Sequence, residues 1–156
     1  STLSIHSFPT RRSSDLSGPI AVVTLVLVLL LKFCALLAVI EHRQSVALLL
    51  APLIGRSAML ALFLGTPYVR AGGLGQALAD HLPRTLGQQV LLLSAVGCVL
   101  VAGVSGLIAL LVACVCFFWL RHLMLRRLGG TTGDTAGALL ELLEVAVLVV
   151  LALVYA

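Results

Sequence analysis

The chain has 156 residues, of which 61% are hydrophobic and only 10% are charged, with a net charge of +4 and a mean hydropathy of +1.19. This composition excludes a soluble globular domain, because several apolar runs reach the roughly 18–20 residues that span a bilayer. The Lys and Arg residues are scattered rather than grouped with aromatic residues, which argues against nucleic-acid binding. We therefore predict an all-α, polytopic integral membrane helical bundle with about five transmembrane helices.

Residues 1–16 differ in character from the rest of the chain. They are polar, without periodicity, and lack the apolar segment of a signal peptide. Residues 8–16 resemble a translated sequencing-adapter remnant. We therefore predict that residues 1–16 are non-native, or else a disordered native tail, and that residues 17–156 are the C-terminal part of a single membrane-embedded domain.

The first two predicted helices each carry a cation among apolar residues. The first runs from about residue 18 to 40 and contains Lys32, and the second runs from about residue 45 to 64 and contains Arg56. A charge at the bilayer centre costs roughly 2.5–3.5 kcal/mol on insertion scales, so it usually faces a polar cavity. We expect both cations to face such a cavity, with structural pairing to carboxylates, or a side chain that extends to the membrane surface, as the alternatives.

Proline and glycine predict one helix start and two interruptions. Pro19 suits the first turn of its helix. Pro52 and Gly55 predict a kink or an unwound turn in the second helix. The apolar region from 89 to 127 is too long for one span, and residues 102–106 predict a tight hairpin that divides it into two helices.

The last predicted helix, residues 136–155, is preceded by a basic, glycine-rich loop and carries carboxylates at its start. Because a helix advances about 100° per residue, Asp134 and Glu141 lie within about 20° of one face, and Glu144 lies about 60° further round. Asp134 or Thr135 is predicted as the N-cap. Carboxylates on one face often hold Mg2+ together with substrate phosphates. We therefore predict a metal site at Asp134, Glu141 and Glu144.

Together these features indicate phosphate chemistry at a membrane surface. A glycine-rich loop exposes backbone N–H groups to a phosphate, and the two buried cations can hold phosphate oxygens. The pattern suits Mg2+-assisted transfer of a phosphate-bearing group. Two alternatives are a transporter or channel subunit with charge-lined helices and a structural membrane subunit whose charges pair internally.

The distribution of arginines predicts the topology. Five spans place loops 65–88 and 121–135 on one side, and the turn 41–44, the hairpin and the C-terminus on the other. The first side carries five arginines and the second carries only Arg43. Since cytoplasmic loops are enriched in Lys and Arg, we predict that the glycine-rich loop is cytoplasmic.

Several stretches resemble the cobalamin synthase family, among them Gly18 with Lys32, which resembles the helix after the family's first conserved region. Residues 129–138, GGTTGDTAGA, with the glutamates that follow, are similar to the C-terminal signature of that family. Arg56-Ser57 and the group Tyr68, Arg70, Gly73, Leu74 and Gly75 are similar to its central segment. The resemblance covers residues 17–156.

The resemblance implies a multi-pass enzyme of the cell inner membrane with a cytoplasmic catalytic face. Such an enzyme joins adenosylcobinamide-GDP to α-ribazole, or to its 5′-phosphate, and releases GMP, with Mg2+ as cofactor. Its partners are these substrates and the lipid bilayer, and homo-oligomerisation stays open. For this reaction we predict Asp134, Glu141 and Glu144 as the catalytic and metal-binding residues. We predict that phosphate is bound by Lys32, Arg56, Arg70, Gly129, Gly130, Thr132 and Gly133.

One part of the family pattern is missing. Family members carry an aspartate-rich motif in their N-terminal half, whereas Asp15 and Asp80 are the only other aspartates here. We therefore expect the 156-residue chain to be inactive by itself.

The predicted topology can be tested with reporters fused after Ala156. We expect an alkaline phosphatase fusion to be active and a green fluorescent protein fusion to be dark, because the C-terminus lies on the side away from the arginines. Bright fluorescence without phosphatase activity would reverse the assignment.

Overall fold

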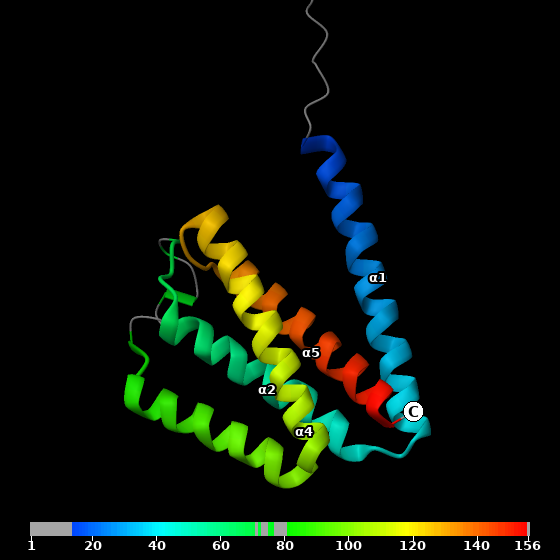
Figure 1. Ribbon diagram of the computed structural model, residues 1–156. Coiled ribbons are helices and arrows are strands. Elements are labelled where there is room, and N and C mark those ends of the chain that lie inside the picture. The colour runs from blue at the N-terminus through cyan, green and yellow to red at the C-terminus, as the bar shows by residue number, and fades with distance from the viewer. Residues whose placement is uncertain (1–13, 71, 73–74, 77–80, 156) are drawn as a thin grey trace, which may run out of the picture.

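The computed structural model describes residues 14–70, 72, 75–76 and 81–155. Its helices are α1 (Ser14–Glu41), α2 (Ser45–Gly65), α4 (Arg84–Leu128) and α5 (Gly133–Tyr155) (Figure 1). All four are long and apolar enough to cross a membrane. The prediction of an all-α, polytopic membrane bundle is confirmed, and the expected number of about five spans is close because α4 has two arms.

The two arms of α4 fold back on each other at Gly103 (Figure 1). Gly103 has φ 57° and ψ −129°, a conformation that is open essentially to glycine. Gly106 then lies so close to the first arm that a Cβ atom there would be 2.2 Å from the carbonyl oxygen of Cys98. The predicted hairpin is therefore found, and its two glycines serve the bend and the close approach.

The predictions about proline are met only in part. Pro19 lies inside α1, not in its first turn, because α1 already begins at Ser14, so that prediction is wrong. The helix α2 runs without interruption from Ser45 to Gly65, so of the two predicted alternatives at Pro52 and Gly55 the unwound turn is absent. Gly55 has a packing role instead, since a Cβ atom there would be 2.9 Å from Cγ of Glu144.

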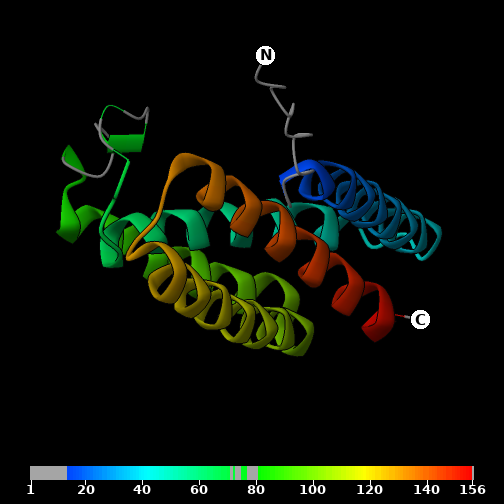
Figure 2. The ribbon, with the colours of Figure 1, turned by 90° about the horizontal axis from the view of Figure 1, so that it is seen from above.

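The helix α5 is the centre of the bundle. It contacts α1, α2 and α4, and it lies between α1 and the other two helices (Figure 2). Its buried side chains include Leu139, Leu143 and Leu151, which are fully enclosed. By contrast, α1 packs chiefly on α5 through its C-terminal half, where Ala35 and Val39 are buried. The position of α1 therefore depends on α5.

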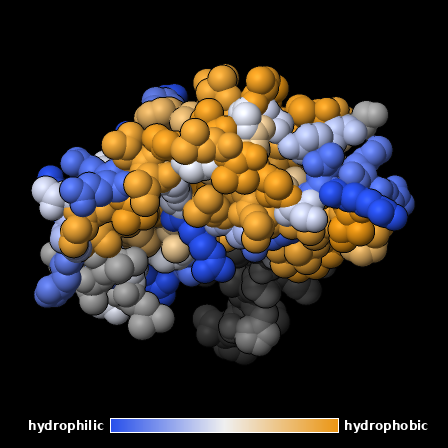
Figure 3. Space-filling view, turned by 90° about the horizontal axis from the view of Figure 1, so that it is seen from below, coloured by the Kyte–Doolittle hydropathy of each residue, from blue (hydrophilic) through white to orange (hydrophobic). Residues whose placement is uncertain are grey.

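The outer surface of the bundle is hydrophobic. Figure 3 shows a face that is mostly apolar, with polar residues gathered toward the ends and in one smaller patch. Large apolar side chains are exposed along α1 and both arms of α4, among them Leu25, Leu93 and Leu111. Such a surface suits lipid, because a helix that is apolar all round is found in a core or a membrane. The protein is therefore a multi-pass membrane protein.

The hairpin in α4 generates a stability prediction. Replacing Gly106 with Ala should lower the free energy of unfolding by about 1–3 kcal/mol, because the new methyl group collides with the first arm. The matched control is Gly97→Ala in the same helix, where a Cβ atom would meet nothing within 4 Å. That change should be neutral or stabilise by up to about 1 kcal/mol. Circular dichroism of thermal unfolding in detergent measures both, and equal effects would contradict the close approach.

Candidate functional site

Two loops that are distant in sequence are joined by backbone hydrogen bonds at one end of the bundle. Val69 N–H donates to the carbonyl of Thr131 over 3.0 Å, and Thr131 N–H donates to the carbonyl of Pro67 over 2.9 Å. Gly130 makes this approach possible, because a Cβ atom there would lie 2.3 Å from the Pro67 oxygen. We call residues 66–70 and 129–135 together the loop junction. The junction places both predicted polar loops on one side of the molecule.

Inside the loop junction, two threonines cap α5 reciprocally. Thr135 N–H donates to Oγ1 of Thr132 over 3.3 Å, and Thr132 N–H donates to Oγ1 of Thr135 over 2.9 Å. Ala136 N–H donates to the carbonyl of Thr132 in the first helical turn. Thr132 is therefore the N-cap, and the prediction of Asp134 or Thr135 is wrong, because the helix begins early enough to include both.

Arg70 and Asp134 form an ion pair across the loop junction. Nη1 of Arg70 is 2.9 Å from Oδ2 of Asp134, and the two side chains are 62% and 85% exposed. Exposed ion pairs contribute only about 0–1 kcal/mol. The pair can therefore open at little cost when a charged ligand arrives.

The backbone amides of the glycine-rich loop are only partly available. Three donate within the protein, namely those of Gly129, Thr131 and Thr132. Three have no acceptor among the described residues, namely those of Gly130, Gly133 and Asp134. The last two belong to the first turn of α5, where the helix dipole favours anions. The capacity to bind a phosphate is thus concentrated beside the Arg70–Asp134 pair.

A second charged group lies inside the bundle, between α1 and α5. Nζ of Lys32 donates to Oε2 of both Glu141 and Glu144, each over 2.8 Å. Lys32 is 21% exposed and Glu144 only 12%, whereas Glu141 is 48% exposed. Lys32 therefore pairs with carboxylates, as the structural alternative for this residue expected.

The three predicted carboxylates do not come together. Glu141 and Glu144 share Lys32, while Asp134 pairs with Arg70 at the loop junction. Within the described part of the chain, no group of three His, Cys, Asp or Glu residues could hold a metal ion. The residues therefore do not fit a magnesium site built from all three carboxylates.

Arg56 stands apart from both charged groups. Its side chain is exposed on α2 and makes no hydrogen bond or ion pair with any residue that the structure describes. Its neighbour Gly55 faces Glu144, so the next position points about 100° away from that carboxylate. The structure thus does not bring Arg56 to the other predicted phosphate ligands.

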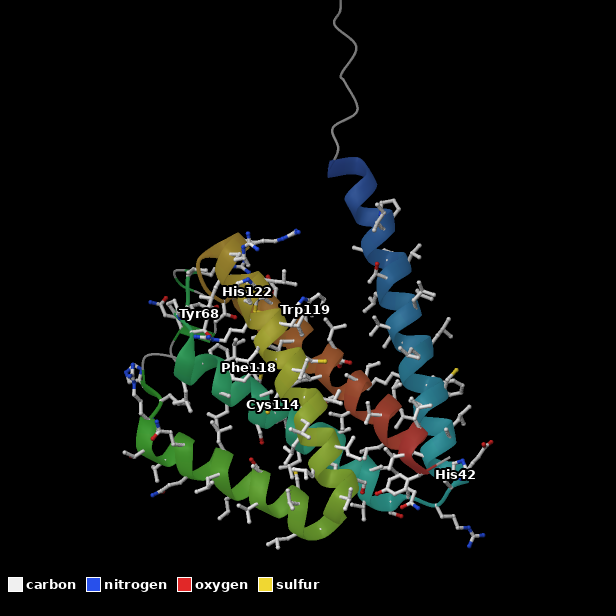
Figure 4. All side chains as sticks on the ribbon, in the orientation of Figure 1. His42, Tyr68, Cys114, Phe118, Trp119 and His122 are labelled. Atoms are coloured by element: carbon white, nitrogen blue, oxygen red, sulfur yellow. The ribbon has the colours of Figure 1, made fainter. Side chains whose placement is uncertain are left out.

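Sequence reasoning assigned no structural role to two residues that shape the loop junction, Arg121 and Tyr68. Arg121, at the end of α4, donates to Oγ1 of Thr66 over 2.9 Å and to the carbonyl of Gly65 over 2.6 Å, so it fixes the end of α2. The Tyr68 ring lies against Gly75 and near the Phe63 ring, with centroids 6.3 Å apart. Figure 4 shows Tyr68 and His122 toward one end and His42 at the other. For Tyr68, the sequence offered one clue, which is its position two residues before Arg70.

An apolar cavity lies elsewhere, between α2 and the two arms of α4. Its volume is about 230 Å³, and its polar side chains are mainly Ser57 and Ser94, which hydrogen-bond to each other over 3.0 Å. None of the predicted site residues lines it. The cavity offers no group for phosphate chemistry, so the loop junction is the better candidate site.

The Lys32 group generates a prediction about stability. Replacing Lys32 with Met leaves two carboxylates uncompensated at membrane depth, and breaking such a pair costs roughly 3–5 kcal/mol when it is fully buried. We expect a loss toward the lower end of that range, because Lys32 is partly exposed. Adding Glu144→Gln to Lys32→Met should restore part of the loss. Thermal unfolding of the variants in detergent measures this coupling, and strictly additive effects would show that the ion pair does not hold α1.

The comparisons with known proteins agree with the sequence resemblance. The family model for cobalamin-5-phosphate synthase matches residues 14–152. An adenosylcobinamide-GDP ribazoletransferase from Pseudomonas syringae pv. tomato is 77% identical over 137 residues, which are 88% of this chain and 56% of the relative. A protein of the same name from Pseudomonas fluorescens Pf-5 is 70% identical over 152 residues, which are 97% of this chain and 60% of the relative.

The chain thus spans somewhat more than half the length of these relatives. The longer alignment reaches into residues 1–16. No solved structure matches the chain. Since the family model covers most of the sequence and the arginine and aspartate of the loop junction lie within it, the chain belongs to the cobalamin-5-phosphate synthase family.

Proposed function

We propose that the protein carrying this chain is an adenosylcobinamide-GDP ribazoletransferase. It would join adenosylcobinamide-GDP to α-ribazole or its 5′-phosphate and release GMP, at the cytoplasmic face of the inner membrane. The names of the relatives support this reaction. The loop junction is the observation that links this reaction to particular residues. There, Arg70 and Asp134 lie beside the two backbone amides at the start of α5 that have no acceptor among the described residues.

The proposed chemistry replaces a phosphoanhydride bond with a phosphate ester bond. A hydroxyl oxygen of the ribazole attacks the phosphorus attached to cobinamide, the bond between that phosphorus and the bridging oxygen breaks, and GMP leaves with that oxygen while the hydroxyl proton passes to solvent. The amides of Gly133 and Asp134 and the guanidinium of Arg70 would bind oxygens of the diphosphate. Donors placed where negative charge develops are usually the largest contribution to such catalysis.

Asp134 would gain a second role once its ion pair opens. When Arg70 turns to the diphosphate, the Asp134 carboxylate becomes an acceptor beside the reacting phosphate, where it can orient the attacking hydroxyl. Mg2+ commonly binds through one or two carboxylates together with substrate phosphates. We propose Asp134 as the single carboxylate that this chain supplies to such an ion, which would neutralise charge on the leaving group.

Lys32, Glu141 and Glu144 would have a positioning role and would not touch the substrate. Their ion pairs hold α1 against α5 and so orient the first turn of α5, where the proposed phosphate site lies. Arg56 remains a proposed phosphate contact, although it has no neighbour in the loop junction. A transporter or a purely structural subunit is not favoured, because neither requires exposed amides and an exposed, easily opened ion pair at a loop.

Activity measurements on the full-length protein test this proposal. We expect Arg70→Met and Asp134→Asn each to lower kcat/KM for the ribazoletransferase reaction by about 10²–10³, the usual loss for one electrostatic donor. The control is Arg43→Gln in the turn at the other end of the bundle, which should retain full activity. Production of GMP and cobalamin at the normal rate by both variants of the loop junction would refute the assignment.

A further inference from the structure

A polar hollow adjoins the loop junction and is used by none of the roles described so far. It has a volume of about 590 Å³ and lies between the end of α2, the segment that follows, and the start of α4. Ligand sites typically measure about 300–1,000 Å³, so the hollow has the size of a small-molecule site. Its polar walls are formed by Thr66, Tyr68, Gln76 and Arg84.

The groups that face the hollow are mainly donors. Arg84 makes no hydrogen bond or ion pair with any described residue. Gln76 uses its Oε1 to accept from Gly72 N–H over 2.7 Å, which leaves its NH2 group free to donate. The Tyr68 side chain also lines the hollow, and its hydroxyl takes part in none of the hydrogen bonds found among the described residues. A guanidinium, an amide NH2 and a phenol together suit a ligand rich in oxygen acceptors, such as a phosphate monoester.

The hollow also has an aromatic wall of fixed orientation. The Tyr68 ring packs against the backbone of Gly75, where a Cβ atom would be only 2.7 Å from Cε2, and it lies near the Phe63 ring. Stacking of a nucleobase on an aromatic side chain contributes about 1–3 kcal/mol. A positioned ring next to an unpaired arginine therefore matches a nucleotide better than it matches a bare anion.

Tyr68 connects the hollow to the loop junction. Its backbone lies at the bridge to Thr131, and Arg70, which pairs with Asp134, follows two residues later in the chain. A ligand in the hollow would thus lie beside the loop junction that carries the Arg70–Asp134 pair. We propose that the hollow binds the nucleoside monophosphate portion of the activated substrate, which becomes the leaving group. This inference rests on the proposed function.

Binding of GMP to the purified protein in lipid nanodiscs tests the inference. Isothermal titration calorimetry should show saturable binding, and Arg84→Gln and Gln76→Ala should each weaken it, the arginine variant by at least tenfold. The matched control is Arg127→Gln, an exposed arginine at the end of α4 and outside the hollow, which should bind GMP normally. Unchanged GMP affinity in Arg84→Gln would overturn the site.

A competition experiment separates a nucleotide site from a general anion site. Inorganic phosphate should compete with GMP only at far higher concentration, because it lacks the base and ribose. Equal affinity for the two would overturn the nucleotide assignment.

The ribazoletransferase assay separates the nucleotide-site inference from the proposed function. Both measurements use the full-length protein. Loss of activity in Arg70→Met with no GMP binding in the hollow would refute this inference alone, whereas GMP binding by a full-length protein without any transferase activity would refute the proposed function alone.

Discussion

One lysine inside the bundle determines how α1 is attached to the rest of the described chain. Lipid cannot solvate an ammonium group, so Lys32 must find carboxylates, and α5 supplies Glu141 and Glu144. Glu144 in turn packs against Gly55 of α2. Three helices are therefore aligned by one group of charges, and the direction of α5, which carries the glycine-rich loop at its start, follows from that alignment.

The charged residues of α5 are divided between two tasks. Glu141 and Glu144 bind Lys32 and so link α5 to α1, whereas Asp134, in the first turn, is exposed and pairs with Arg70. The backbone hydrogen bonds of the loop junction fix the positions of Tyr68 and Thr131 beside this exposed pair. A fixed backbone next to an exposed ion pair is what the proposed phosphate site requires.

The sequence predicted the spans and the hairpin well, because long apolar runs and the glycines around Gly103 report directly on membrane crossing and bending. It could not predict the loop junction, since backbone bonds between distant loops leave no side-chain pattern. Asp134 and Glu141 lie on one face of α5 by helical spacing. That spacing does not show that Asp134 would pair with Arg70 and Glu141 with Lys32, because those partners come from other parts of the chain. The choice of Thr132 as the cap also lay beyond local rules, because adjacent Thr and Asp residues are both good caps.

Because of the bend at Gly103, the two ends of the bundle differ strongly in how much polar loop they expose. The end that contains Gly103 and the short turn around Arg43 exposes very little polar backbone, because the two arms of α4 reverse direction with no intervening loop. A protease, an antibody or a water-soluble labelling reagent applied to that end would find few places to act. Most of the polar loop that the structure describes lies at the other end of the bundle, so a soluble molecule would find most of its polar contacts there.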